Sequence, residues 1–277
     1  MRFDETWQQE MEEQDSTVEV LNYGVGGYGL DQAYLRYMKE RQSLKSDIVL
    51  IGYMTDDIYR HQNIFRPFFS AKTGLPFGKP RFEFSGDTLV LDPNPFPTRN
   101  HYHELLKNPD ELLREAGKHD VYYQKAQKSG PLDFFASVRL CKIAFEKISD
   151  RFDRDFSLAE VYADNSSPFK VARLLFERFC GVVKQDGAEP VVVLFPNKRD
   201  VKRYQQTKEN YYHSLHRYFI EQDQIYLDLL PAFAEIESDS LLNSLFQNHY
   251  TPEGNRFVAT QILEFLKSAN GKQALLQ

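Results

Sequence analysis

The chain has 277 residues, a formal net charge of −6 and 42% hydrophobic residues. This length suits one large α/β domain, or one domain that carries an elaborate insertion. The acidic balance argues against nonspecific nucleic-acid binding, which needs a basic surface, and no apolar stretch approaches the roughly 20 residues of a membrane span.

The first elements expected along the chain are a helix and a strand, followed by a second helix and strand. Their ranges are residues 5–14, Thr17–Asn22, Asp31–Arg41 and Asp47–Tyr53. After Asp47 the last of them is apolar, as in a strand buried on both faces. A strand, a helix and a strand in succession form a βαβ unit, which predicts parallel pairing with a right-handed crossover.

The next segment, from Arg60 to about Asp120, is rich in Pro, Phe and Gly and lacks a helical period. Arg81–Phe84 and Thr88–Leu91 alternate around a Ser-Gly-Asp turn, which predicts a β-hairpin. We interpret residues 60–130 as an insertion that acts as a lid over the carboxyl edge of the sheet. Its phenylalanines either line an acyl or aromatic pocket or form a small core.

The remaining elements continue the alternation of helices and strands. We expect helices over Pro131–Phe152, Ser167 to about Lys184, and Lys208–Gln222, strands over Pro190–Phe195 and Gln224–Leu229, and a final helix capped by Thr251 with Pro252 in its first turn. The two cysteines, Cys141 and Cys180, fall in expected helices and indicate buried thiols. No secretory signal precedes the fold, so the chain as given is expected to be cytoplasmic.

A loop with four glycines in six residues follows the first expected strand. Gly24, Gly26 and Gly29 fit the G-x-G-x-x-G dinucleotide fingerprint. The same loop is also typical of an oxyanion-stabilising loop in an ester hydrolase, because glycine lets backbone N–H groups approach a ligand oxygen. A third interpretation is a tight turn from strand to helix with no ligand.

Three blocks, in this order, resemble the SGNH (GDSL-type) hydrolase superfamily. They are Asn22-Tyr-Gly-Val-Gly-Gly27, Gly52-Tyr-Met-Thr-Asp-Asp57 and Asn248-His-Tyr-Thr-Pro-Glu-Gly254, and the resemblance runs from about Glu5 to Leu266. It implies a single domain over residues 1–277, with a three-layer α/β/α, mostly parallel, flavodoxin-like sheet. It also implies ester hydrolysis or O-acyl transfer by a serine nucleophile without a cofactor or a metal, on a small-molecule, glycan or lipid ester.

The resemblance assigns roles to individual residues. Gly27 would donate its N–H to the oxyanion, and His249 would be the general base. Asp56 or Asp57 aligns with the family's asparagine donor to the oxyanion, although an ionised carboxylate cannot donate a hydrogen bond. Further candidates for substrate contacts are Asn22, Tyr28, Arg60 and Asn248.

Two parts of the family's machinery are missing from the sequence. The position of the triad acid falls on Phe246 or Gln247, with Asp228 as a distant substitute, and the Gly-Asp-Ser block that carries the nucleophile is absent. In relatives that block precedes a segment like Glu5-Thr-Trp7, so we expect an N-terminally truncated protein that is inactive as written. The alternatives are a noncatalytic pseudoenzyme that binds an acyl or glycan ligand, and a dinucleotide-binding protein.

Overall fold

The computed structural model describes residues 5–69, 77–86, 88–118, 120, 122–123, 158–247 and 249–268. The chain divides into two compact units. The first comprises Met1–Tyr28, Tyr37–Thr55 and Phe176–Gln277, and the second comprises Gly29–Arg36 and Asp56–Leu175. The divisions fall within helices α2 (Leu30–Glu40) and α8 (Ser167–Gln185).

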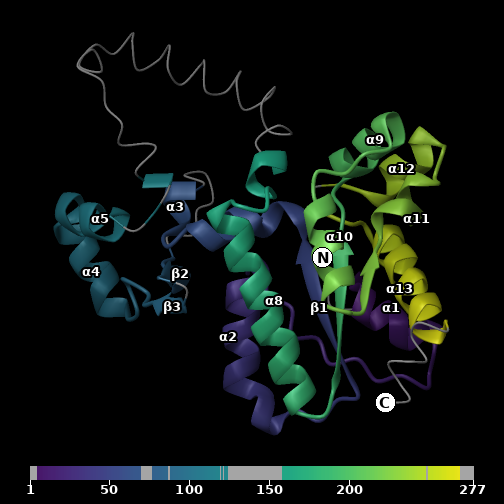
Figure 1. Ribbon diagram of the computed structural model, residues 1–277, viewed down its shortest axis with the longest axis horizontal. Helices are drawn as coiled ribbons and strands as arrows, with labels where there is room; N and C mark the ends of the chain where they lie inside the picture. The colour runs from purple at the N-terminus through teal and green to yellow at the C-terminus, as the bar shows by residue number, and fades with distance from the viewer. Residues whose placement is uncertain are drawn as a thin grey trace. The chain divides into compact units, whose positions relative to one another are not determined.

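A parallel three-stranded sheet forms the centre of the first unit (Figure 1). Its strands are β1 (Ile48–Met54), β4 (Glu189–Phe195) and β5 (Tyr226–Asp228), and β4 lies between the other two. Ile48 is in register with Glu189, and Val192 with Tyr226. The expected mixed α/β class and the parallel pairing are confirmed.

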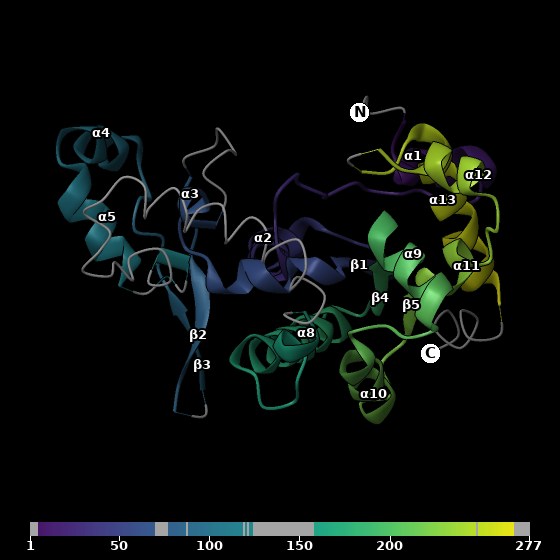
Figure 2. The same cartoon turned by 90° about the horizontal axis from the view of Figure 1, so that it is seen from above.

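The first unit also contains several helices around this sheet. They are α1 (Trp7–Gln14), the 3-10 turn η2 (Arg41–Ser43), α9 (Lys198–Thr207), α10 (His213–Glu221), α11 (Leu230–Ala234), α12 (Asp239–Leu245) and α13 (Pro252–Lys267), with the C-terminal part of α2 and most of α8. Figure 2 shows α1 and α13 on one side of the strands and α10 on the other. The expected helix over residues 5–14 and the helix after the glycine loop are confirmed.

Aromatic contacts fasten helices to both faces of the sheet. On one face the ring of Tyr53 in β1 lies 5.2 Å from Phe176 of α8, which in turn lies 5.1 Å from Phe219 of α10. On the other face Trp7 of α1 lies 5.8 Å from Phe195 of β4. Successive side chains of a strand point to opposite faces, so both faces of the sheet are packed.

Two sequence-based expectations are wrong in the first unit. Thr17–Asn22 is not a strand, because its backbone bonds locally: the N–H of Val18 donates to Asp15 O at 3.2 Å, and that of Val20 to Glu12 Oε1 at 2.8 Å. The helix expected from Lys208 begins only at His213. Lys208 instead adopts a left-handed φ of 59° and ends α9 by donating its N–H to the carbonyl of Tyr204.

The helix caps that the sequence predicts lie at, or one residue from, their expected positions. Thr251 caps α13 by accepting a hydrogen bond from the N–H of Gly254 at 3.1 Å, and Pro252 occupies the first turn, as expected. The cap of α8 is displaced by one residue, since the hydroxyl of Ser166, and not that of Ser167, accepts from the N–H of Phe169. Asn197 caps α9 in a capping box with Asp200.

The second unit contains the expected hairpin and a small separate core. Its further elements are η3 (Thr55–Gln62, from Asp56 onward), α3 (Arg66–Phe69), β2 (Arg81–Ser85), β3 (Thr88–Asp92), α4 (Arg99–Lys107) and α5 (Pro109–Gly117). β2 and β3 pair antiparallel, which confirms the hairpin. Phe65 and Phe96 are buried in a cluster with Ile64 and Ala116, against which Phe68 packs, so several of the phenylalanines do form a core.

The thiol of Cys180 is buried and makes no disulfide, and burial raises its pKa to about 12. It is therefore protonated and unreactive at neutral pH. Cys141 and the helix expected over Pro131–Phe152 lie outside the described residues. Among the helices of the described ranges, none combines the length and the apolar character needed to span a bilayer.

Replacing Asn197 with Ala should lower the free energy of unfolding by about 1 kcal/mol, because the variant loses the acceptor for the N–H groups of Arg199 and Asp200. Asn197→Asp keeps an acceptor at the same position and should stay close to the wild type. Urea denaturation of the three proteins measures the difference. Equal losses in both variants would contradict the capping role.

Candidate functional site

The glycine loop is closed by the side chain of Asn22. Its amide oxygen accepts hydrogen bonds from the N–H of Gly24 at 2.9 Å and from Nε2 of Gln8 in α1 at 3.2 Å. Because this oxygen holds the turn together, Asn22 has a structural function here in addition to its expected substrate contact. The loop does not follow a strand, so it lacks the context that the dinucleotide fingerprint requires.

Gly27 lies at the tip of this loop with a left-handed φ of 86°. A turn is closed across it, because the N–H of Tyr28 donates to Val25 O at 3.1 Å. Among the described residues no acceptor binds the N–H of Gly26 or Gly27, and both glycines are exposed. A side chain would strain the backbone at Gly27, so this position needs glycine for its conformation. Tyr28 beside it is 37% exposed.

His249 is exposed in the loop between α12 and α13. The N–H of Gln247 donates to His249 O at 2.8 Å, and Phe246 forms an antiparallel bridge with Tyr250. The hydroxyl of Tyr250 donates to Pro196 O at 2.6 Å, immediately after β4. These contacts fix the histidine loop at the carboxyl end of the central strand. Asn248 lies outside the described residues.

The glycine loop and the histidine loop are both tied to the start of α1. Asn22 binds Gln8 in the first turn of that helix. Asn255, in the first turn of α13, donates its side-chain N–H to Glu5 O at 2.6 Å, just before α1 begins. The two segments that the sequence singled out, more than 200 residues apart in the sequence, therefore share one anchor in the first unit.

No acid supports His249 among the described residues. Phe246, at the expected position of the triad acid, is 6% exposed and packs against Phe233. The substitute, Asp228, is engaged elsewhere: it accepts from the hydroxyl of Tyr212 at 3.0 Å and lies 2.9 Å from Nε2 of another histidine, His216. The imidazole of His249 has no hydrogen-bond partner in the described part of the chain.

Asp57 and Arg60 lie together in the second unit. Oδ1 of Asp57 is 3.0 Å from Nε of Arg60, and the side chain of Asp57 is 13% exposed. The pKa of Asp57 is raised to about 7, mainly because the carboxyl is buried; Arg60 acts against this shift, and the neighbouring Asp56 adds to it. Near neutral pH this carboxyl is therefore partly protonated, and a protonated carboxyl can donate a hydrogen bond.

Other buried charges of the second unit were not identified from the sequence. Asp31 is fully buried and pairs with Lys79, which is 48 residues away along the chain. His61 is 2% exposed, and burial lowers its pKa to about 4, so its imidazole is neutral at physiological pH. Asp31 follows the glycine loop directly, in the first turn of α2. Acidic residues are common there because they stabilise the helix N-terminus, so its position in the sequence does not indicate a buried ion pair.

Asn63 and Asp120 hold the start of the second unit together. Asn63 Nδ2 donates to Asp120 Oδ2 at 2.9 Å, and the N–H of Ile64 donates to the same oxygen at 2.7 Å. Asn63 thus fastens the segment after η3. Within the described residues no group of three or more His, Cys, Asp or Glu side chains is arranged to hold a metal ion.

Comparison of the chain with protein-family models, with curated proteins and with solved structures yields no match.

Asp57→Asn should stabilise the protein at high pH, because the folded wild type must ionise a carboxyl whose pKa is about 7 rather than 3.8. A raised carboxyl pKa means that stability falls as pH rises through this interval. At about 1.36 kcal/mol per pKa unit, the variant should gain up to about 4 kcal/mol above pH 7 and little near pH 4.

Chemical denaturation at pH 4 and pH 8 measures this difference. Asp110→Asn, at an exposed position of α5 in the same unit, is the matched control and should show no comparable change. A gain of equal size at both pH values would show that ionisation of Asp57 is not its cause.

Proposed function

We propose that this chain supplies the oxyanion loop and the general base of an SGNH-type ester hydrolase or O-acyl transferase. Gly27 donates its backbone N–H to the oxyanion, and His249 takes the proton from a serine nucleophile. The observation that supports this function is the common anchor of the two loops at the start of α1, near the carboxyl end of β4. Parallel sheets commonly bind ligands at that end of their strands.

The conformation of the glycine loop supports the oxyanion role. Acyl transfer develops negative charge on the carbonyl oxygen, and fixed backbone N–H groups stabilise that charge without reorganising during the reaction. Gly27 is held at a φ of 86° by a turn, and its N–H has no acceptor among the described residues. Its donor is thus oriented before any ligand binds.

The surroundings of His249 are compatible with a general base that takes up the proton more slowly than the histidine of a full triad. The imidazole is exposed and its main chain is fixed, but the described residues provide no carboxylate beside it. In a full triad such a carboxylate holds the imidazole in the right tautomer and stabilises the imidazolium. We therefore expect slower acylation than in an enzyme with a complete triad.

The reaction also needs a serine nucleophile. Ser16 follows α1 in a turn, and Ser43 lies in η2, where its hydroxyl donates to Glu40 O at 2.8 Å. Neither follows a strand, where a nucleophile would be presented at the carboxyl edge of the sheet. The proposal therefore requires a serine other than these two.

Expression of the protein as its gene encodes it, followed by reaction with a fluorophosphonate probe, tests this function. We expect covalent labelling of the wild type, and at least about 100-fold slower labelling of His249→Ala, since a general base contributes that much or more. His213→Ala removes an exposed histidine at the start of α10 and serves as the control.

Equal labelling of wild type and His249→Ala would refute the assignment of the base. Absence of labelling in the wild type would refute the hydrolase itself and favour a noncatalytic protein that binds an acyl or glycan ligand.

A further inference from the structure

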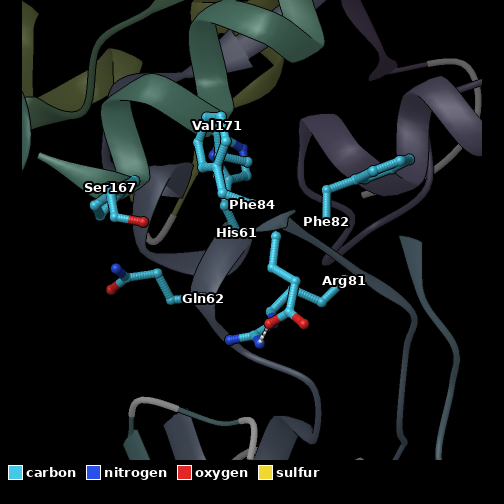
Figure 3. A pocket seen from close by; sticks show the side chains of 9 residues that line it. His61, Gln62, Arg81, Phe82, Phe84, Ser167 and Val171 are labelled. Atoms are coloured by element: carbon cyan, nitrogen blue, oxygen red, sulfur yellow. Dashed lines mark hydrogen bonds and ion pairs between the residues drawn. The ribbon is translucent and has the colours of Figure 1, made fainter. Parts of the chain in front are cut away.

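A small cavity lies within the second unit, between η3, β2 and α8. Its volume is about 210 Å³, and its lining includes Gln62, Arg81, Phe82, Glu83, Ser167 and Val171. Figure 3 shows Gln62, Arg81, Ser167 and Val171, which come from these three elements; the ring of Phe82 points away from Gln62 and Ser167. Clefts for drug-sized ligands measure roughly 300–1,000 Å³, so this cavity suits a ligand of a single ring.

Arg81 brings an unused hydrogen-bond donor to the cavity. Its side chain is only 8% exposed, and its Nη2 lies 2.5 Å from Oε2 of Glu83. Nε of the same guanidinium is buried and has no hydrogen-bond partner in the described residues. Leaving a buried donor without an acceptor is costly, and such groups are rare in folded proteins. A ligand oxygen in the cavity would supply the missing acceptor.

Gln62 and Ser167 add groups that can both donate and accept. Neither side chain makes a hydrogen bond within the described part of the chain, although both line the cavity. His61 lines the cavity as well, with a buried and neutral imidazole. An amide and a hydroxyl can each bind the hydroxyl groups of a ligand, which likewise donate and accept.

The charges of the lining favour a neutral ligand. Arg81 and Glu83 carry opposite charges and are paired with each other, so an anion would meet the carboxylate and a cation the guanidinium. Pro168 and Val171 of α8 line the cavity and add an apolar surface for the face of a ring. A ligand that matches all of these features is neutral, bears several hydroxyl groups and has one apolar face.

We propose that this cavity is a binding site for a monosaccharide or a single sugar residue. Arg81 Nε and the side chains of Gln62 and Ser167 bind its hydroxyl groups, and Pro168 and Val171 contact the ring. The site consists of residues of the second unit alone and does not rest on the proposed esterase function. For so small a ligand we expect an affinity in the millimolar range.

Saturation-transfer difference NMR on the full chain tests the proposal with glucose, galactose, mannose and N-acetylglucosamine as separate probes. We expect at least one sugar to receive saturation and to bind about tenfold more weakly to Gln62→Leu, the equivalent of losing one to two hydrogen bonds. Gln222→Leu makes the same substitution at an exposed position in the first unit and should bind like the wild type. Thermal unfolding of each variant verifies that it folds.

A second variant, Arg81→Lys, keeps the positive charge and removes the Nε donor, so it should also weaken binding. Inorganic phosphate, followed by ³¹P NMR, is the anionic probe. Binding of phosphate without any sugar would overturn the proposal in favour of an anion site. Failure of all four sugars, or equal affinity of wild type and folded Gln62→Leu, would overturn it as well.

Discussion

The complete burial of β4 is the constraint on which the first unit depends. Val191, Val192, Val193 and Leu194 are at most 1% exposed, because strands lie on both edges of β4 and helices on both faces. A strand that is buried on both faces needs apolar side chains at every position, because a polar side chain would be left in the core. The strand ends at Phe195, and the irregular backbone that follows at once receives the histidine loop. The last buried residue of β4, Phe195, is thus followed directly by Pro196, whose carbonyl holds the histidine loop.

The sequence predicted those elements whose signal is local. An apolar run identified β1 and β4, alternation around a turn identified the hairpin, and Thr251-Pro252 identified the start of α13. The expected strand over Thr17–Asn22 is wrong because a short apolar segment does not show whether another strand pairs with it. There the side chain of Glu12 and the end of α1 satisfy the backbone instead.

The candidate site was predicted less completely, since its contacts join distant parts of the chain. The glycine loop and His249 stand out in the sequence, but their shared attachment to α1 depends on Gln8 and Asn255, two polar residues with no distinctive context. The polar cavity of the second unit was likewise not predictable from the sequence, because its lining comes from three separate segments. Spacing along the chain carries no information about such pairings until the fold brings the residues together.

The buried carboxyl of Asp57 and the buried imidazole of His61 have a joint consequence for proton exchange. Folding holds both groups in their neutral forms, since it raises one pKa to about 7 and lowers the other to about 4. Between about pH 4 and 6.5, unfolding releases a proton from the carboxyl and adds one to the imidazole. The release and the uptake cancel, so the contribution of this pair to the free energy of unfolding is nearly independent of pH over that range. Two groups that are each costly to bury thus compensate each other in the pH dependence of stability.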